Sequence, residues 1–306
     1  TTLYFMTSVA ALLRDYTVFT GDKSIRKRPV QPLLTALNQL GAQSSTTREG
    51  NACAPFFIKG PIRGGEVNVP CTTSQYISSL MIAAPMCDGN IRITTDHPAE
   101  IPYLDMTIKW LKEAGIQVTY DEKEHKFFEI KGNQKYKAFD KYMPSDWSSV
   151  AFPTVAALTP ASNLTIRNMD FKDLIIHGGK QLHGISMDLK NTPDALPILC
   201  VAGCMADGTT VLDNVAGARL KETDRVSVMT EALSLMGADI SATENTITIH
   251  GGKKLRGCVQ DSHGDHRIAM ALTVAGMSAE GCTEITGAEC ASVTFPNFYP
   301  KMQSCG

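Results

Sequence analysis

The chain carries a pattern that is clearest in residues 226–251, which read VSVMTEALSLMGADISATENTITIHG. The first half has apolar residues at helical spacing and stops at Gly237, which predicts an amphipathic helix that ends at a glycine. The second half alternates apolar and polar residues up to Gly251, which predicts strands with one buried face. The stretch therefore predicts a helix that packs on a sheet.

The end of this stretch, an apolar strand followed by a basic residue and a glycine, occurs four times. The four copies end at Gly60, Gly132, Gly178 and Gly251, which are 72, 46 and 73 residues apart. A second landmark, a small polar helix start followed by an alanine-rich helix and a strand, occurs at 2–19, 73–93, 146–166, 194–212 and 265–285. Recurrence at a fixed period is the signature of a repeated structural unit.

The repeated unit is predicted to run helix, strand, helix, strand, strand, so the fold class is α/β with helices packed on sheets. Further helices of the kind that ends in a glycine precede Gly41 and Gly115. Charged residues give way to a new helix start near Tyr142, which predicts domains at 1–142 and 143–306. We expect two similar halves with a cleft between them.

The third interval is shorter than the others by about 26 residues, and the expected second helix is absent between Asp170 and Ile175. Either this copy is truncated, or a stretch is absent from the sequence and its flanks are joined; we favour the second explanation. The first residue, Thr1, is not a methionine and lies inside a helical pattern, so we expect the natural chain to begin elsewhere.

Composition excludes several classes of function. With 306 residues, 43% of them apolar, the chain is long enough for packed cores, and its formal charge of −2 does not suit a nucleic-acid or anionic membrane partner. No apolar run approaches the ~20 residues of a membrane helix, so we expect a cytoplasmic protein. The nine cysteines form no CxxC pair, and we interpret them, Cys200 and Cys204 included, as buried apolar residues rather than metal ligands.

The charged run 219–225 contains Lys221, Glu222 and Arg225 and precedes a helix expected to begin near Thr223. A helix start and cations together favour an anion, and a carboxylate among cations is a candidate proton carrier. An ordinary exposed helix start explains the run alone equally well.

Three other helix starts carry residues of comparable interest. Asp265, His266 and Arg267 combine a helix cap with a proton-exchanging imidazole and a bidentate cation. Thr73, Ser74 and Gln75 offer hydroxyl and amide groups suited to a sugar phosphate, although helix capping alone also explains them. Asp194 follows Pro193, where an aspartate is usually a cap, and Arg28 belongs to a basic cluster before Pro29, which is expected to open a helix.

These runs, in this order, resemble the EPSP synthase family of enolpyruvyl transferases over essentially the whole chain. The resemblance implies two domains of three units each and transfer of the enolpyruvyl group of phosphoenolpyruvate to the 5-hydroxyl of shikimate 3-phosphate, without a metal or organic cofactor. It implies that Arg28, Arg225 and Arg267, with His266 beside them, hold phosphoenolpyruvate. The site for shikimate 3-phosphate would be lined by Thr73, Ser74, Gln75, Tyr103 and Lys221. Asp194 and Glu222 would transfer protons.

The resemblance also implies a monomer that glyphosate could inhibit. The family's first unit, which contains a Lys and an Arg of the site, has no counterpart, so the chain alone is expected to be inactive. The sequence departs from the family at Tyr4, Glu100, Gly217 and Val293. Two alternatives stay open: a non-catalytic or split homologue that binds shikimate 3-phosphate, and the related transferase that acts on UDP-N-acetylglucosamine.

Overall fold

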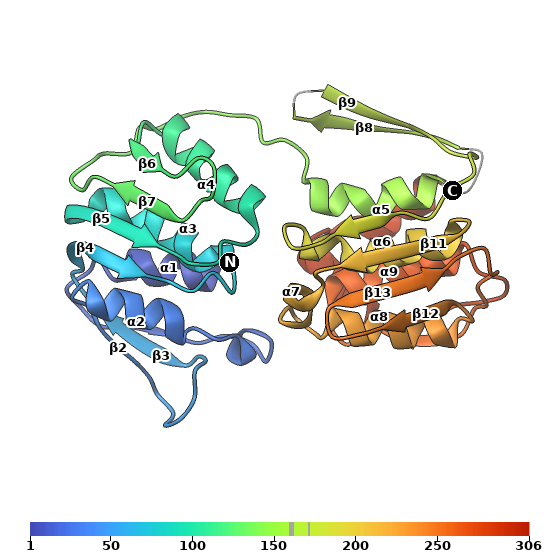
Figure 1. Cartoon of the computed structure of the whole chain (residues 1–306), viewed down its shortest axis with the longest axis horizontal. Coiled ribbons are helices and arrows are strands. Elements are labelled where there is room, and N and C mark those ends of the chain that lie inside the picture. Colours follow the sequence, from blue (N-terminus) through green and yellow to red (C-terminus); the bar gives the residue numbers. More distant parts are fainter. Residues whose placement is uncertain (159–161, 171, 306) are drawn as a thin grey trace. The chain divides into compact units, whose positions relative to one another are not determined.

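A computed structural model describes residues 1–158, 162–170 and 172–305 of the chain. The chain divides into two compact units, Thr1–Lys141 and Tyr142–Gly306, and each has its own hydrophobic core. Figure 1 shows that both units combine helices with sheets.

Unit 1 contains a three-stranded sheet of order β1-β3-β2 and a four-stranded sheet of order β4-β5-β7-β6. Its helices α1 and α3 pack against each other, as do α3 and α4 (Figure 1). The elements, with short 3-10 helices written η, are α1 (Thr2–Ala10), β1 (Thr17–Phe19), η1 (Ile25–Lys27), α2 (Gln31–Gln39), β2 (Gln43–Thr46), β3 (Phe56–Lys59), β4 (Arg63–Asn68), α3 (Ser74–Ala83), η2 (Ala84–Met86), β5 (Asp88–Thr94), α4 (Ile101–Glu113), β6 (Val118–Tyr120) and β7 (Phe127–Ile130).

Unit 2 contains a four-stranded sheet of order β10-β11-β13-β12 and two two-stranded sheets, β8-β9 and β14-β15. Helix α6 packs against α5, α8 and α9. The elements are α5 (Trp147–Leu158), β8 (Asn163–Met169), β9 (Lys172–His177), β10 (Ser186–Asp188), η3 (Pro193–Ala195), α6 (Leu196–Met205), β11 (Thr209–Asp213), α7 (Ala216–Arg219), α8 (Arg225–Leu235), β12 (Asp239–Ala242), β13 (Thr246–His250), β14 (Val259–Asp261), α9 (His266–Met277), β15 (Glu284–Thr286), η4 (Ala288–Val293) and α10 (Phe298–Cys305).

The predicted repeat is confirmed. The order helix, strand, helix, strand, strand occurs as α1-β1-α2-β2-β3, as α3-β5-α4-β6-β7 and as α6-β11-α8-β12-β13, with the short helix α7 before α8 in the last copy. Each second helix is followed by the expected glycine in a left-handed conformation, with φ of 101° at Gly41, 82° at Gly115 and 90° at Gly237. A side chain is strained at such φ values, which is why glycine ends these helices.

The glycine that closes each unit has a different role. A Cβ atom at Gly132 would lie 2.2 Å from the carbonyl oxygen of Gly89, and one at Gly251 would lie 1.9 Å from that of Ala206. These distances are far below van der Waals contact, so any side chain would force the strand end away from the turn beside it. The repeated glycine therefore marks a close backbone approach rather than a special φ value.

Sequence reasoning missed one strand of the unit. The short strands β4, β10 and β14 pair in parallel with β5, β11 and β15, respectively. They escape a pattern search because β10 and β14 have three residues each and β4 reads RGGEVN, which is mostly polar. In each case a helix connects the two parallel strands, so its N-terminus lies at their carboxyl edge, where α/β proteins bind ligands.

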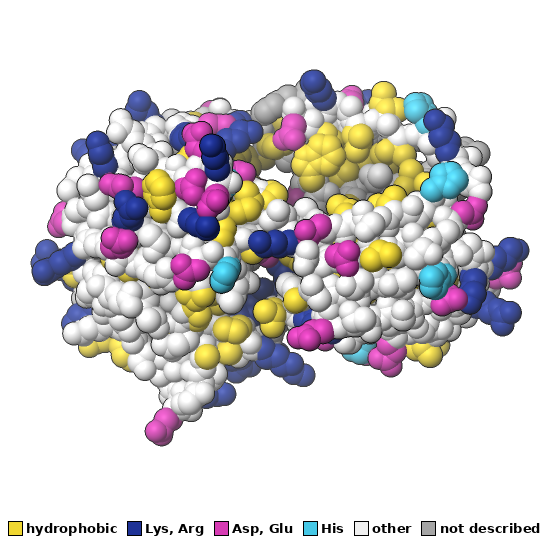
Figure 2. Space-filling view, in the orientation of Figure 1, with side chains coloured by type: hydrophobic (Ala, Val, Ile, Leu, Met, Phe, Trp, Pro, Cys, Tyr) yellow, Lys and Arg dark blue, Asp and Glu magenta, His cyan; other side chains and the backbone are white. Residues whose placement is uncertain are grey.

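The short third interval corresponds to a short sheet. Strand β8 pairs directly with β9, and the described residues contain no helix between Met169 and Lys172. Strands β7 and β13 each have neighbours on both sides, whereas among the described residues β9 pairs only with β8. Figure 2 shows hydrophobic side chains in a hollow near this sheet, and Ile175 on β9 is 58% exposed. The described residues of this unit therefore contain no counterpart of the second helix and the further strand that the other units have there.

The prediction that the cysteines are buried apolar residues is confirmed in part. Cys71, Cys87, Cys200 and Cys204 are buried, whereas Cys53, Cys258 and Cys290 are half-buried and Cys282 is exposed. Within the described residues, none of the helices has both the length and the apolar character needed to cross a membrane.

Candidate active site

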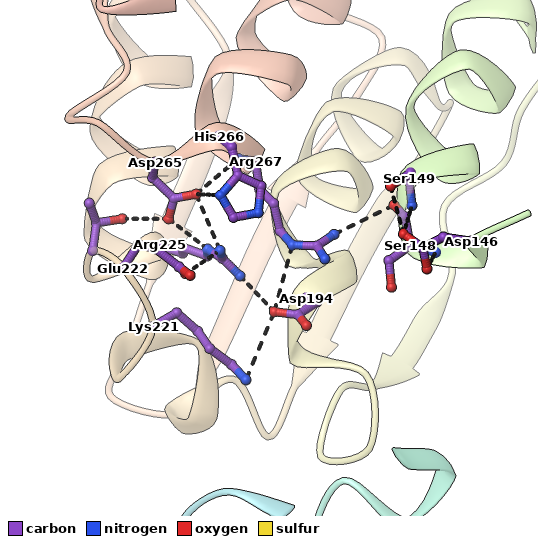
Figure 3. Close-up of polar contacts among 11 residues, drawn as sticks. Asp146, Ser148, Ser149, Asp194, Lys221, Glu222, Arg225, Asp265, His266 and Arg267 are labelled. Atoms are coloured by element: carbon purple, nitrogen blue, oxygen red, sulfur yellow. Dashed lines mark hydrogen bonds and ion pairs between the residues drawn. The ribbon is translucent and has the colours of Figure 1, made fainter. Parts of the chain in front are cut away.

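A cluster of charged side chains lies at the N-termini of the unit 2 helices (Figure 3). Asp194 comes from the turn η3 before α6, Arg225 from the first residue of α8, and His266 and Arg267 from the first turn of α9. The loop before α8 contributes Lys221 and Glu222. The structure therefore brings together six residues that the sequence predicted separately.

Arg225 is the centre of this cluster and is 1% exposed. Its guanidinium donates to Asp265 through Nε (2.8 Å) and Nη2 (3.2 Å), to Asp194 through Nη1 (2.7 Å) and to Glu222 through Nη2 (2.6 Å). A buried charge is tolerated only when it is paired in this way. Arg225 thus fixes three carboxylates relative to one another.

Asp194 is surrounded by cations. Its Oδ1 atom lies 2.7 Å from Nη1 of Arg225, 3.8 Å from Nζ of Lys221 and 3.8 Å from Nε of Arg267. Burial alone would raise the pKa of Asp194, but the charges of Lys221, Arg267 and Arg225 outweigh burial and hold the pKa well below its ordinary value. The carboxylate is therefore ionised at neutral pH.

The usual explanation for an aspartate at this position, a helix cap, is wrong for Asp194. No side-chain hydrogen bond caps η3 or α6 at its N-terminus. Asp265, in contrast, caps α9 by accepting from the backbone N–H of Arg267 and also binds Arg225. Asp194 instead directs its carboxylate toward the cations of the cluster.

Sequence reasoning did not include Asp265 among the site residues, because its position before a helix explained it as a cap. The structure shows that it is fully buried and that it also accepts a hydrogen bond from the hydroxyl of Thr223. Burial alone would raise its pKa, but the charge and hydrogen bonds of Arg225 lower the pKa of Asp265 below its ordinary value. Asp194 occupies the equivalent position one repeat earlier, and this equivalence was the signal that could have identified Asp265 as a site residue.

His266 is buried beside these groups, with Nδ1 3.9 Å from Oδ1 of Asp265. Burial lowers the pKa of His266, and Arg267 and Arg225 lower it as well, whereas Asp265 and Glu222 oppose this shift. The net pKa lies below the ordinary value, so the imidazole is neutral near pH 7 and can accept a proton.

Other parts of the run 219–225 are structural. The helix expected near Thr223 begins at Arg225, and Asp224 caps it by accepting from the backbone N–H of Ser227. Arg219 donates to Asp224 and to the carbonyl oxygens of Thr243 and Glu244. Arg219 and Asp224 thus hold the loop in place while Lys221 and Glu222 face Asp194 and Arg225.

A second group of predicted residues lies at the N-terminus of α3 in unit 1. Thr73 caps α3, as predicted, by accepting from the N–H of Gln75. The carboxylate of Glu100 accepts hydrogen bonds from the N–H and hydroxyl of Ser74 and from the hydroxyl of Thr73. The amide oxygen of Gln75 is buried and has no hydrogen-bond partner among the described residues.

The segment around Arg28 differs from the prediction. Pro29 does not open a helix, because α2 begins at Gln31 after an extended stretch. The carbonyl oxygen of Pro29 instead accepts hydrogen bonds from the buried hydroxyls of Tyr4 (2.9 Å) and Tyr76 (2.6 Å). Tyr4, one of the departures from the family pattern, thus anchors the segment that carries the half-buried Arg28.

The remaining predicted residues occupy separate positions. Tyr103 is half-buried in the first turn of α4, Gly217 lies in α7, and Val293 is 77% exposed at the end of η4. Cys200 and Cys204 lie in the core of unit 2, where burial raises the pKa of Cys204 to about 12. Within the described residues, no three His, Cys, Asp or Glu side chains are grouped as metal ligands would be.

Fold and site together define an enolpyruvyl transferase. EPSP synthase of Acinetobacter baumannii superposes with a TM-score of 0.83 at 28% identity, over 99% of this chain and 76% of that one. The enolpyruvyl transferase NikO of Streptomyces tendae superposes with a TM-score of 0.75 over 95% of this chain and 73% of that one; at 13% identity it supports the fold alone. This structural class includes several activities.

The chain belongs to the EPSP synthase family. The model of EPSP synthase (3-phosphoshikimate 1-carboxyvinyltransferase) matches residues 1–177 and 170–302. A protein of that name from Acetivibrio thermocellus is 40% identical over 329 aligned positions, covering 100% of this chain and 77% of the relative. One from Ruminiclostridium cellulolyticum is 41% identical, covering 97% of this chain and 75% of the relative.

These relatives favour the shikimate enzyme over the UDP-N-acetylglucosamine transferase and over a non-catalytic homologue. The two segments matched by the family model meet at 170–177, where the repeat interval is short. The 329 aligned positions also exceed the 306 residues of the chain, so the relative has residues without a counterpart here. Both observations agree with a third unit that is shorter than its relatives'.

Proposed function

We propose that the chain transfers the enolpyruvyl group of phosphoenolpyruvate to the 5-hydroxyl of shikimate 3-phosphate by addition and elimination, with release of phosphate. The observation that carries this proposal is the convergence of Lys221, Arg225 and Arg267 on one carboxylate oxygen of Asp194. The reaction joins two anions and moves protons between them. Cations that surround a carboxylate meet both needs.

We assign the binding of the phosphate and carboxylate of phosphoenolpyruvate to Arg28, Arg225 and Arg267, with His266 beside them. Arg267 is suited to this role because its partly exposed guanidinium lies next to Asp194. The hydrogen bonds of Arg225 described above end on carboxylates of the protein, so a substrate anion that binds it must replace one of them. The two partly exposed carboxylates, Glu222 and Asp194, are the candidates for replacement.

Asp194 and Glu222 are assigned to proton transfer. The 5-hydroxyl loses a proton as its oxygen attacks, and the methylene carbon of phosphoenolpyruvate gains one; that carbon loses a proton again when phosphate leaves. Asp194 is ionised, so its carboxylate is in the form that can accept a proton. Glu222 contacts the same guanidinium from the other side, so both carboxylates are held by one cation.

Shikimate 3-phosphate is assigned to Thr73, Ser74, Gln75, Tyr103 and Lys221. The hydroxyls of Thr73 and Ser74 and the N–H of Ser74 already bind a carboxylate, so they are arranged to bind an anion. The buried amide of Gln75 has an acceptor that a hydroxyl of the shikimate ring could satisfy. We further propose that the enzyme acts as a monomer and that glyphosate competes with phosphoenolpyruvate.

The proposal is tested by incubating the purified chain with both substrates and following phosphate release. Release that requires both substrates is expected when the chain is supplied with the family's first unit rather than from the chain alone, and it should fall in Glu222→Gln but not in Glu231→Gln, a matched control on the exposed face of α8. Binding of each substrate is measured in parallel by calorimetry. If neither substrate binds and no phosphate is released, the assignment is wrong for this chain.

A further inference from the structure

The N-terminus of α3 holds a carboxylate that belongs to the protein. One oxygen of Glu100, Oε2, lies 2.9 Å from the backbone nitrogen of Ser74, 2.7 Å from its hydroxyl and 3.3 Å from the hydroxyl of Thr73. Glu100 is 6% exposed and Ser74 is 2% exposed. One backbone N–H and two hydroxyls that converge on an oxygen form the type of arrangement that binds a phosphate group.

Glu100 is an unusual residue for this position. It is the N-cap residue of α4, yet its side chain makes no capping bond to α4 and instead accepts from the first residue of α3. Its φ of 54° is in the left-handed region, which is uncommon for residues other than glycine, asparagine and aspartate. A buried charge on a strained backbone persists only if strong interactions hold it. The three donors from Thr73 and Ser74 are among these interactions.

The same donors are those assigned above to the phosphate of shikimate 3-phosphate. A backbone N–H and a hydroxyl each have one hydrogen to donate, so the donors of Thr73 and Ser74 that bind Glu100 cannot at the same time bind a phosphate oxygen. The carboxylate of Glu100 therefore stands where a phosphate oxygen would be bound.

We propose that Glu100 is an internal competitor for the phosphate of the substrate and so determines how tightly unit 1 binds shikimate 3-phosphate. The substrate phosphate must displace the Glu100 carboxylate before it can reach Thr73 and Ser74. This inference rests on the proposed function for the identity of the substrate, but the three contacts of Glu100 with Thr73 and Ser74 are observed within unit 1 whatever the substrate is. A smaller neutral residue at position 100 leaves the donors open to phosphate.

The inference is tested by measuring, with calorimetry, the binding of inorganic phosphate, shikimate 3-phosphate and unphosphorylated shikimate to the chain and to Glu100→Ser. Glu100→Ser is expected to bind both phosphate ligands at least 10-fold more tightly, with shikimate unchanged. Glu122→Ser, which removes the same charge from an exposed turn of unit 1, should leave all three affinities as they are. Removing the Thr73 hydroxyl as well, in Glu100→Ser/Thr73→Val, should abolish most of the gain.

Equal or weaker phosphate binding by Glu100→Ser would overturn the inference. If this variant does not fold, as judged by thermal unfolding, Glu100→Gln decides, because it keeps the size of the side chain and removes the charge; it should bind phosphate at least 3-fold more tightly. Tighter binding of inorganic phosphate by the variant, with no binding of shikimate 3-phosphate to either protein, would contradict the proposed substrate and support the role of Glu100. Equal binding of shikimate 3-phosphate to the chain and to the variant would support the proposed substrate and contradict the role of Glu100.

Discussion

The two anion-binding arrangements, at α3 in unit 1 and around Arg225 in unit 2, both hold carboxylates of the protein itself but hold them differently. At α3, one backbone N–H and two hydroxyls, all neutral, donate to the carboxylate of Glu100. The arrangement in unit 2 consists of three cations, Lys221, Arg225 and Arg267, among three carboxylates, Asp194, Glu222 and Asp265.

The difference determines what a substrate anion can do at each place. When one anion replaces another on neutral donors, the donors themselves carry no charge that has to be compensated. In unit 2 each charge stabilises its neighbours, so loss of one leaves a buried partner uncompensated. The first arrangement can therefore exchange one anion for another, whereas in the second a carboxylate that leaves Arg225 must be replaced by another anion.

The largest effect is expected from Asp265→Asn. Asp265 is fully buried against Arg225, which is itself 1% exposed. Removing one partner of a buried ion pair costs about 3–5 kcal/mol in the free energy of unfolding. Urea denaturation measures this loss, and Asp239→Asn, which removes one partner of an exposed pair with Lys253, is the control that should change little. A similar small change for both variants would show that the pair around Arg225 does not stabilise the fold.

The unit 2 arrangement also predicts how stability depends on pH. The pKa values of Asp194 and Asp265 lie below their ordinary values in the folded state, so their contribution is present above the pKa of the unfolded chain, about 3.9. It is lost as pH falls through the folded pKa values, because the unfolded state then binds more protons. With two such groups, the free energy of unfolding should fall by up to ~2.7 kcal/mol for each pH unit below pH 4. Urea denaturation between pH 5 and 3 tests this, and in Asp265→Asn the slope should be shallower.

Catalysis should be affected by Glu222→Gln with a smaller change in stability. Glu222 is partly exposed and contacts Arg225 at 2.6 Å, and the amide keeps the shape of the side chain while it loses the ability to carry a proton. We expect kcat to fall about 100-fold, the lower range for loss of general acid–base catalysis. The affinity for shikimate 3-phosphate should stay within about 3-fold, since the anion-binding donors remain. An unchanged kcat would exclude Glu222 from proton transfer.

The smallest effect is expected in unit 1. Thr73→Ala removes the cap of α3 and one of the donors to Glu100, at a cost of about 1 kcal/mol in the free energy of unfolding. It should also weaken binding of shikimate 3-phosphate without lowering kcat. Thr72→Ala, at the exposed residue just before it, is the matched control. A loss of kcat in Thr73→Ala at saturating substrate would mean that the two arrangements are not separate in function.

Much of the fold could be predicted from the spacing of particular residues. Apolar residues at helical intervals before Gly41, Gly115 and Gly237 indicated the second helix of each unit, and the strand ends before Gly60, Gly132 and Gly251 indicated its last strand. The strands β4, β10 and β14 could not be predicted in this way, because three residues, or a polar run with two glycines, contain too little periodicity. They become strands only when a neighbouring strand supplies the hydrogen bonds.

The sequence by itself determined the repeated α/β unit, the short third copy, and most of the residues at the helix N-termini. Tertiary structure alone decided their partners: that Arg225 lies buried among Asp194, Glu222 and Asp265, that Asp194 caps no helix, and that Glu100 binds the N-terminus of α3. The physical reason is that periodicity and capping are local, whereas the partners of Arg225 and Ser74 are as far as 40 and 26 residues away in sequence. Only the folded backbone brings such charges and donors within hydrogen-bonding distance.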